Sequence, residues 1–586
     1  LSEGTVTQRP LPEALIRRFV GGRGFIVRWL YDMVQPGTDP LAPEMPLIFA
    51  VGPLTGTITT SNSGGHWGPA LKYAGYDLLI LEGRAPRPSY LFLHNDRAEV
   101  RDAAAYWGKT TSEAEEGIRQ EVGVPDARIA GIGPAGENLV RFAAIQGDYG
   151  HVASKNGVGA VMGKKRLKAV AIVRGSRGLR AADPRAVIQV ADDIAYDLRT
   201  DPSAKSLYEW GTLPAVVNLG KMGVLPIKNY TTNVPYDDLG NWEAPKLREA
   251  FDHRGHQCNA CGMRHCHMQV IREGEHRGRI VDEPEYEGWS GCGWQIGATD
   301  KAGISWLNTQ VDRACVDVNE FGWICGWVME CQERKLITER QLGFRLPWGD
   351  IKGADRLLQM ISRRQGLGDL LAEGIKRAAE KLGGAAQEAA IYTLQGCSPR
   401  GHDHRGRWDE MLDTCTSSTG TLESGVPVHV TELGLPARIN PFAGEEVARL
   451  VAGIRGRRHF EDSLGICIFT ARTRMENLCR ALNAVTGWAY SVDDAMRFGR
   501  RTAAILRAVR LRCGLGTDLE KPSARYGSTP HDGPAKGQAI SEQWDRMVSL
   551  WYELVGYDRR TGKPLPKTLR DLGLDWLAKD LWGRRP

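Results

Sequence analysis

The feature that most constrains this chain is a group of cysteines at residues 257–268. Cys258, Cys261 and Cys266 lie close enough in sequence for one tight loop to point three thiolates at a single centre. Thiolates bind zinc or iron–sulfur clusters, and three of them leave one ligand to come from elsewhere. Cys467, in the run Asp-Ser-Leu-Gly-Ile-Cys, is the candidate for that fourth ligand.

The spacing of these cysteines leaves other interpretations open. A structural zinc site would be completed by His265 or His267, and unligated buried cysteines would need no further partner. The chain has 12 cysteines at irregular spacing in 586 residues, which is not the pattern of a secreted disulfide framework. We therefore expect a reducing compartment and a cytoplasmic location.

Length and composition limit the class of protein. A chain of 586 residues exceeds a single core, so two to four domains are expected. The sequence has no apolar run long enough to span a bilayer, and its first residues do not resemble a secretory signal. The formal net charge of +6 suits an acidic redox partner and gives little support for nucleic-acid binding.

The first third of the chain alternates strands with glycine-rich turns. Ser89–His94 is a short apolar run and predicts a strand. Glycine-rich loops lie at 19–24, 61–69, 131–138 and 153–163, and the last misses the glycine spacing of a dinucleotide-binding loop. One such loop favours an ordinary turn. Four in one region favour a large anionic cofactor, because small residues let the backbone approach phosphate.

From about residue 181 the pattern becomes mainly helical. Hydrophobic periodicity predicts helices at 181–199, 300–332, 369–382, 473–484 and 492–512. The predicted fold class is α+β. We expect a β-rich domain at 1–178, a mainly helical domain with the cysteine loop at 179–390, and a mainly helical C-terminal domain at 391–586.

A loop dense in ionisable groups opens the third region. Residues 396–406 read Gly-Cys-Ser-Pro-Arg-Gly-His-Asp-His-Arg-Gly. The loop is either a catalytic or anion-binding segment or a hydrogen-bonded structural turn, and its density of ionisable groups favours the functional interpretation.

Together these motifs resemble the aldehyde:ferredoxin oxidoreductase family, tungsten enzymes with two pyranopterins and one [4Fe–4S] cluster. The resemblance covers nearly the whole chain and keeps the family's order. It is carried by the cysteine loop and by Gly-Gly-Arg-Gly at 21–24, Gly-Pro-Leu-Thr-Gly-Thr at 52–57, Ser-Asn-Ser-Gly-Gly-His-Trp-Gly-Pro at 61–69, Gly-Pro-Ala-Gly-Glu-Asn at 133–138, Gly-Val-Gly-Ala-Val-Met-Gly at 157–163, Pro-Glu-Tyr-Glu at 284–287, Gly-Leu-Gly-Asp-Leu-Leu-Ala-Glu-Gly at 366–374 and Asp-Ser-Leu-Gly-Ile-Cys at 462–467.

The resemblance implies cofactors and the residues that hold them. The β-rich domain would hold a bis-molybdopterin cofactor with tungsten or molybdenum, with a magnesium ion bridging the pterin phosphates. The [4Fe–4S] cluster would be bound by Cys258, Cys261, Cys266 and Cys467. The residues that would contact the pterins are Arg23, Gly24, Ser63, Gly64, Gly65, His66, Asn156, Gly157, Gly159, Ala160, Asp462, Gly465 and Ile466.

The implied reaction is oxidation of an aldehyde to a carboxylic acid, or the reverse. Electrons would leave singly through the cluster to a ferredoxin or ferredoxin-like subunit, in a homo-oligomer or a hetero-complex. Glu287, with Glu285 beside it, is where a general base would lie, and a structural ion pair is the alternative role for both. His402 and His404 are further catalytic candidates.

Two other functions stay open at this point. A branch of the family reduces aromatic acyl-coenzyme A thioesters at low potential, and Cys292 lies roughly where that branch has a metal ligand. A non-catalytic electron-transfer subunit is the third hypothesis, and the intact glycine loops count against it.

The chain departs from the family pattern in the cysteine loop and in a pterin motif. His265 stands where the third cysteine is expected, and Cys266, reached by a one-residue bulge, is the preferred ligand. Asn-Glu-Phe-Gly-Trp-Ile at 319–324 replaces the family's Asp-x-x-Gly-Leu-Asp.

Two further departures concern missing groups. No histidine stands at 419–423, where the family has its active-site histidine, so His402 or His404 would take its role. Thr57 runs directly into Ile58, where the family has a segment with a pterin-contacting arginine. That segment is missing either from the protein or only from this sequence.

Overall fold

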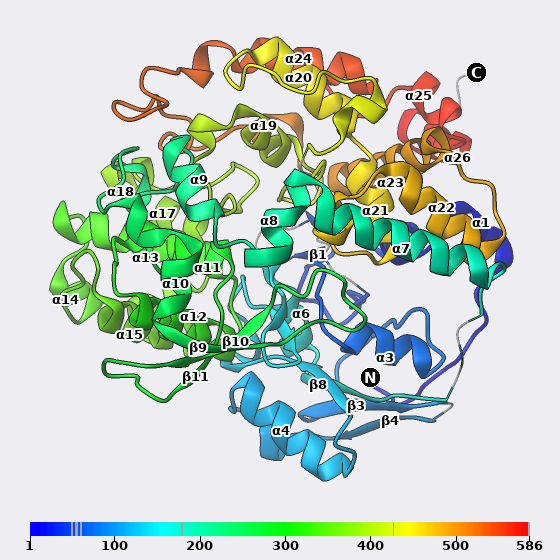
Figure 1. The fold of residues 1–586 in the computed structure, drawn as a ribbon, viewed down its shortest axis with the longest axis horizontal. Helices are drawn as coiled ribbons and strands as arrows, with labels where there is room; N and C mark the ends of the chain where they lie inside the picture. The colour runs from blue at the N-terminus through cyan, green and yellow to red at the C-terminus, as the bar shows by residue number, and fades with distance from the viewer. Residues whose placement is uncertain are drawn as a thin grey trace.

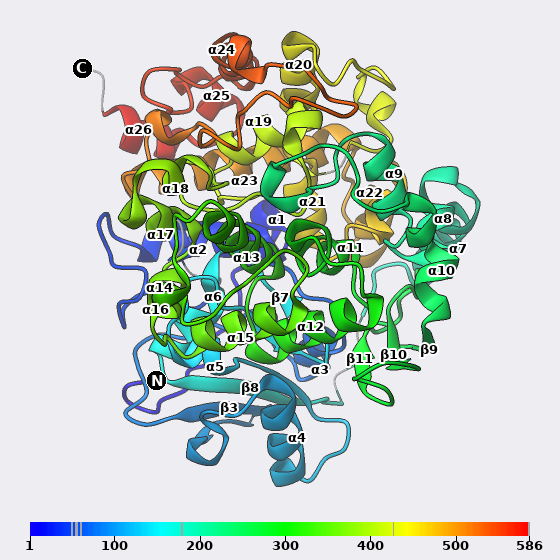
Figure 2. The ribbon, with the colours of Figure 1, turned by 90° about the vertical axis from the view of Figure 1, so that its left-hand side faces the viewer.

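The structure, a computed structural model, describes residues 1–48, 51–52, 57–58, 61–95, 97–176, 178, 180–425 and 427–583. Helices make up 49% of the structure and strands 9%, with the main sheet in the N-terminal region, so the predicted α+β class is confirmed. The sheet lies at one end of the molecule, at the bottom of Figures 1 and 2, and helices fill the remainder.

The N-terminal sheet has six strands in the order β4-β3-β8-β5-β6-β7. Only β3 and β8 pair in parallel among these neighbours. Residues of β8 are buried throughout because apolar clusters cover both faces of the sheet. The strands are β3 Ser89–His94, β4 Arg97–Asp102, β5 Arg128–Gly131, β6 Ile145–Gly147, β7 His151–Ala153 and β8 Leu167–Val173. The strand predicted at 89–94 is confirmed.

Helices and short pairs of strands complete this region. A capping box from Thr110 to Glu113 starts α4, which packs its Ala114 and Ile118 on the sheet. The helices are α1 Glu13–Phe19, α2 Gly22–Met33, α3 Trp67–Tyr73, α4 Thr111–Val122, α5 Pro134–Glu137 and α6 Val158–Lys164, and the strand pair is β1 Val51–Gly52 with β2 Thr57–Ile58.

The middle region is built around a large apolar core. Its helix α13 is buried on nearly every side, which explains a sequence rich in Trp, Cys and Gly. Its helices are α7 Pro184–Thr200, α8 Pro202–Trp210, α9 Ala215–Lys221, α10 Ala244–Glu249, α11 Tyr286–Gly291, α12 Lys301–Ala314, α13 Val318–Glu333, α14 Glu339–Leu342, α15 Ile351–Ser362, α16 Leu367–Leu371, α17 Ile375–Leu382 and α18 Gly384–Glu388. A small antiparallel sheet, in the order β11-β10-β9, consists of β9 Phe251–Gly255, β10 His267–Ile271 and β11 Ile280–Asp282.

Two predicted helices are each divided in the structure. The segment 300–332 forms α12 and α13, with Cys315 between them in a left-handed conformation (φ 64°). The segment 369–382 forms the end of α16 and all of α17, separated at Gly374, whose φ is 90°. A residue with positive φ cannot continue a right-handed helix. The apolar periodicity runs across both interruptions and therefore did not reveal them.

The C-terminal helices pack against the beginning of the chain. Helix α2 contacts both α21 and α23, and Figure 2 shows α1 and α2, in blue, among the orange helices. The helices are α19 Trp408–Thr416, α20 Gly444–Ile454, α21 Arg457–Leu464, α22 Met475–Thr486, α23 Val492–Arg512, α24 Trp544–Val555, α25 Pro566–Asp571 and α26 Asp575–Trp582. The prediction at 492–512 is confirmed. The domain boundaries at residues 178 and 390 stay predictions.

Helix α23 crosses the turn before α21 so closely that Gly499 has no room for a side chain. A Cβ there would lie well inside van der Waals contact of the Gly456 carbonyl oxygen. We expect Gly499→Ala to destabilise the protein by about 1–3 kcal/mol, because backbone must move to admit the methyl group. Thermal unfolding measures this. Gly255→Ala, where no atom lies within 4 Å of the added Cβ, is the control. An unchanged midpoint for Gly499→Ala would contradict the expectation.

Within the described residues, no helix is both long enough and apolar enough to cross a membrane.

Candidate functional site

The cysteine loop, residues 256–266, connects the antiparallel strands β9 and β10. The backbone N–H of His256 donates to the carbonyl of Cys266 at 2.8 Å and closes the neck of the loop. Cys258, Cys266 and His151 form one group, because their potential ligand atoms all lie within 4.8 Å of one another. A local hairpin therefore brings two of the predicted cluster ligands together.

The surroundings of Cys258 favour its thiolate. A hydrogen bond from Cys266 lowers the pKa of Cys258 far below its ordinary value, against the effect of burial. His151 and the backbone N–H of Gly65 lower that pKa further. The same contact raises the pKa of Cys266, so Cys258 is the thiolate of this pair, which is the form that binds metal.

The segment with Cys467 lies against the cysteine loop. Cys467 follows α21, and it lies within electrostatic range of Cys258. The ring of Phe469 packs edge-on to His265 at 5.0 Å, and Phe469 contacts the same small apolar cluster as Cys261. The tertiary fold thus brings the segment of the fourth predicted ligand to the other three.

The glycine-rich loop at 63–66 runs beside this centre. A Cβ on Gly64 would lie 2.9 Å from the sulfur of Cys258. Gly65 has a φ of 89°, and the next backbone N–H, that of His66, donates to Asp148 at 2.6 Å. Only glycine allows the backbone to approach the cysteine this closely.

A second glycine loop meets the segment that precedes Cys467. Arg23 pairs with Asp462 at 2.6 Å, and the N–H of Gly24 donates to the hydroxyl of Ser463 at 3.1 Å. Asn62 also donates to Asp462, at 2.6 Å. Gly465 then turns the chain with a φ of 69° before Ile466. Three of the predicted cofactor-binding segments therefore converge here.

The fourth glycine segment is largely engaged in packing. Asn156 donates to the carbonyl of Thr419 at 2.6 Å, and Gly157, with a φ of 82°, precedes α6. A Cβ on Gly159 would collide with the Ala144 carbonyl, and Ala160 is fully buried. Whether these residues contact a cofactor stays a prediction.

The donors present fit the expected groups. Four cysteines from two segments match the ligand count of a [4Fe–4S] cluster. Arg23 Nε and Arg458 NH1 are buried without a hydrogen-bond partner among the described residues. Buried polar atoms normally have partners, so these cations beside the glycine loops suit an anionic, oxygen-rich ligand such as a pyranopterin phosphate.

Helix α11 carries both glutamates of the Pro-Glu-Tyr-Glu motif. Glu285 lies at its N-cap position and accepts a hydrogen bond from His265 at 2.7 Å and one from Thr212. Burial alone would raise the pKa of Glu285, but the hydrogen bond and charge of His265 outweigh it. His265 Nε2 lies 3.7 Å from the sulfur of Cys266, so His265 links the cysteine loop to this helix.

Glu287 differs from Glu285 in its environment. Burial raises the pKa of Glu287 above its ordinary value, although the Arg400 guanidinium opposes the shift. No ion pair or side-chain hydrogen bond joins the Glu287 carboxylate to another residue in the described part of the chain. A carboxylate with a raised pKa and no fixed partner is suited to proton transfer.

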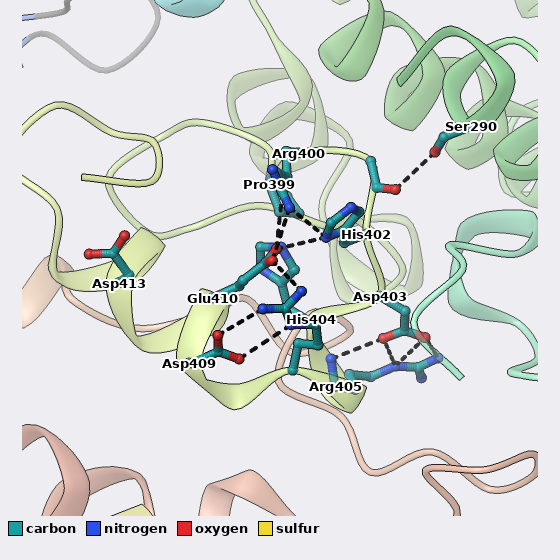
Figure 3. Close-up of polar contacts among 12 residues, drawn as sticks. Ser290, Pro399, Arg400, His402, Asp403, His404, Arg405, Asp409, Glu410 and Asp413 are labelled. Carbon is teal, nitrogen blue, oxygen red and sulfur yellow. Dashed lines mark hydrogen bonds and ion pairs between the residues drawn. The ribbon is translucent and has the colours of Figure 1, made fainter. Parts of the chain in front are cut away.

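Glu410, on α19, is the centre of the ionisable loop. Arg400 and Arg407 each lie 3.0 Å from its carboxylate, His402 Nδ1 lies at 2.8 Å and His404 Nε2 at 2.9 Å (Figure 3). Burial alone would raise the pKa of Glu410, but the two guanidinium groups hold it well below its usual range. Glu410 was not predicted, because nothing local distinguishes it from an ordinary helix glutamate.

The two histidines of this loop have different surroundings. His404 is fully buried, and its Nδ1 bonds Tyr526 at 2.6 Å, whereas its Nε2 approaches Glu410 without the geometry of a hydrogen bond. The ring of His402 packs edge-on to Tyr286, next to Glu287, at 5.1 Å. Burial, aided by Arg400, lowers the pKa of His402 to about 3, so this ring is neutral at physiological pH. Their catalytic roles stay predictions.

Two profiles of one family match the sequence. The profile described as aldehyde ferredoxin oxidoreductase, domains 2 and 3, matches residues 189–574. The N-terminal domain profile matches in two pieces, residues 1–59 and 52–174. The tungsten-containing aldehyde ferredoxin oxidoreductase of Pyrococcus furiosus is 33% identical over 98% of this chain and 97% of its own length.

The chain belongs to the aldehyde ferredoxin oxidoreductase family.

Other proteins are similar over the same extent. The tungsten-containing enzyme of Thermococcus kodakarensis is 31% identical over 98% of this chain and 97% of its own. An aliphatic sulfonate oxidoreductase subunit of Pyrococcus furiosus, described as WOR-like, is 31% identical over 98% and 96%. The BamBC active-site complex of benzoyl coenzyme A reductase, solved with 1,5-dienoyl-CoA, shares the fold, with a TM-score of 0.82 and 22% identity over 99% of this chain and 96% of that one.

Family membership accounts for the order of the motifs but not for the positions at which this chain differs from the family pattern. No histidine stands at 419–423, where Thr419, Gly420 and Glu423 are buried and Glu423 pairs with His459 at 3.0 Å. His459, which was not predicted as a site residue, also lies 3.2 Å from Arg23 and so lies next to the glycine-rich loop at 19–24. Most of the motif at 52–57, and residues 59 and 60 beyond the Thr57–Ile58 junction, lie outside the described residues.

Proposed function

We propose that this chain is a pyranopterin oxidoreductase that converts an aldehyde to a carboxylic acid, or the reverse. The observation that carries the proposal is the position of α11 between two sites. Glu285 connects it through His265 to the cysteine loop, and Tyr286 donates to the carbonyl of Gly401 in the ionisable loop at 2.6 Å. Helix α11, which carries Glu287, thus connects the cysteine loop with the ionisable loop.

The proposed centre consists of tungsten, or molybdenum, on two pyranopterins, with one [4Fe–4S] cluster. Cys258, Cys261, Cys266 and Cys467 would hold the cluster, and the glycine loops with Arg23 and Arg458 would hold the pterins. When bound, the metal supplies two-electron oxidation and the cluster one-electron transfer. Magnesium between pterin phosphates is part of the proposal by family resemblance alone.

The chain's own residues would position the substrate and move its protons. The overall change converts R–CHO and water to R–COO⁻, three protons and two electrons, and the electrons leave through the tungsten or molybdenum centre. Glu287 takes one proton at its carboxylate, and its raised pKa leaves it a stronger base than an ordinary glutamate. His402 lies beside Tyr286 as a neutral hydrogen-bonding group.

Cys292 does not support the alternative acyl-coenzyme A chemistry. It is fully buried in the main apolar core, and burial raises the pKa of its thiol well above the ordinary value. It follows Glu287 by five residues on α11, which places it on another side of that short helix. We therefore propose a packing role for Cys292.

Metal analysis combined with turnover tests this function. We expect tungsten or molybdenum, iron near four atoms per chain, and aldehyde-dependent reduction of a viologen dye by anaerobically purified protein. A carboxylic acid should appear as product. Zinc without iron would refute the cluster, and metal-loaded protein inactive with short aliphatic and aromatic aldehydes would refute the reaction.

Electron transfer should go to a separate protein rather than to a nicotinamide. The chain has one predicted cluster and a formal net charge of +6, which suits an acidic ferredoxin. We expect aldehyde-dependent ferredoxin reduction to slow as ionic strength rises, because salt screens the attraction. Reduction of the viologen dye should depend much less on ionic strength and is the control. Stoichiometric NAD reduction by the isolated chain would contradict this expectation.

A further inference from the structure

Arg400 has one guanidinium nitrogen, NH1, that the protein does not use. Its Nε and NH2 contact the Glu410 carboxylate at 3.1 and 3.0 Å, and NH2 also lies 3.1 Å from His402 Nδ1. Within the described residues NH1 has no hydrogen-bond or ion-pair partner, and the side chain is 22% exposed. A partly accessible guanidinium nitrogen can donate to a ligand oxygen.

The loop that carries Arg400 is attached rigidly to the helix of Glu287. The Gly401 carbonyl accepts hydrogen bonds from Tyr286 at 2.6 Å and from Ser290 at 3.1 Å, both on α11 (Figure 3 shows the Ser290 contact). A Cβ on Gly401 would lie 2.6 Å from the Ser290 hydroxyl, so this close approach requires glycine. The positions of Arg400 and Glu287 are therefore determined together.

Arg400 influences Glu287 without touching it. It is the charge with the largest effect on the pKa of Glu287, yet the two side chains form no ion pair. Neither side chain is fully buried. The hydrogen bonds of Gly401 therefore hold the Arg400 loop against the helix of Glu287, and both side chains are partly accessible to a ligand.

Neighbouring cations of the loop are already engaged. Arg405 makes a two-point contact with Asp403, with its NH2 at 2.7 Å, on another side of the loop (Figure 3). Arg407 pairs with Asp409 at 2.9 Å and with Glu410 at 3.0 Å. The same neighbours argue against a divalent cation between His402, His404 and Glu410, because two guanidinium groups already hold that carboxylate.

We propose that NH1 of Arg400 binds an oxygen atom at the reacting end of a substrate that also reaches Glu287. The site would then bind small carboxylates, which are the acid products or the acid substrates of the reverse reaction, more tightly than neutral aldehydes. A carboxylate oxygen accepts a charge-assisted hydrogen bond from NH1, and such a bond is about twice as strong as a neutral one. This inference rests on the proposed function and assigns Arg400 a direct part in it.

The test compares holoenzymes with Arg400 and with Arg400→Gln. Glu410 keeps Arg407, His402 and His404 in the variant, so its charge stays compensated. We expect the acetate dissociation constant, measured by calorimetry and as an inhibition constant, to rise about tenfold or more. We also expect the acidic side of the pH–rate profile to move to higher pH, because loss of a positive charge raises the pKa of Glu287.

Arg407→Gln is the matched control. It also removes one guanidinium from Glu410, but Arg407 is not among the groups that shift the pKa of Glu287. Acetate affinity and the acidic side of the pH–rate profile should stay as in the wild type. Equal losses in both variants, or no change in Arg400→Gln, would overturn the proposal.

If Arg400→Gln does not fold, Arg400→Lys tests the proposed role of Arg400 instead. Lysine keeps the charge, so the acidic side of the pH–rate profile should stay in place, but its single ammonium group cannot hold Glu410 as the Arg400 fork does and also present a free N–H to the substrate. Acetate affinity equal to that of the wild type would overturn the proposal. Arg400-dependent acetate binding without turnover of any aldehyde would instead refute the proposed reaction.

Discussion

Replacement of Glu287 by glutamine should lower the rate of aldehyde oxidation by about a hundredfold to ten-thousandfold. Glutamine keeps the size of the side chain and much of its hydrogen bonding but cannot accept the proton. The wild-type rate should fall on the acidic side of its pH profile, at a pH above the ordinary glutamate range, because the pKa of Glu287 is raised. This fall should be absent in Glu287→Gln. Steady-state rates across pH, with metal content measured on each preparation, provide the test.

Cys292→Ser is the control for this experiment. Cys292 shares α11 with Glu287 but lies in the apolar core, so serine should leave the metal content and most of the activity intact. Loss of the W(V) resonance and of turnover in Cys292→Ser, with the cluster signal preserved, would make Cys292 a metal ligand. A Glu287→Gln enzyme with wild-type rates would show that the base is elsewhere.

Cys467→Ala should remove or degrade the iron–sulfur cluster although Cys467 lies far from the cysteine loop in sequence. Three cysteines of the loop leave one iron without a protein thiolate, and the fold brings the Cys467 segment to them. Electron paramagnetic resonance of the reduced variant, with iron determination, measures the loss. Electron transfer to ferredoxin should fall with the cluster signal.

Cys513→Ala separates this effect from general loss of a thiol. Cys513 packs at the edge of a different apolar cluster, near the N-terminal helices, so its removal should leave the cluster unchanged. An unaltered cubane signal in Cys467→Ala would place the fourth ligand elsewhere, with His265, 3.7 Å from Cys266, as the next candidate.

The sequence by itself determined the features that depend on neighbouring residues. The strand at 89–94 and the helix at 492–512 follow from local periodicity, and Ser491 with Asp494 forms the capping box that starts that helix. The cysteine loop is likewise local, because one hairpin between β9 and β10 contains its three thiols. Family membership followed from the order of such local motifs.

Only the tertiary structure decided which distant groups face one another. The breaks at Cys315 and Gly374 depend on backbone angles that apolar periodicity does not encode. Glu410 became the centre of the ionisable loop because α19 turns it towards Arg400 and both histidines. In the sequence His402 and His404 are equivalent candidates.

Packing distinguishes these two histidines. Tyr526, more than a hundred residues away, bonds Nδ1 of His404, whereas His402 lies beside Tyr286 on the helix of Glu287. The direction of a side chain depends on what the folded chain places around it, and these contacts join segments that are remote in sequence. For that reason the local sequence pattern identified the candidate residues, and long-range packing determined which of them can contact a substrate.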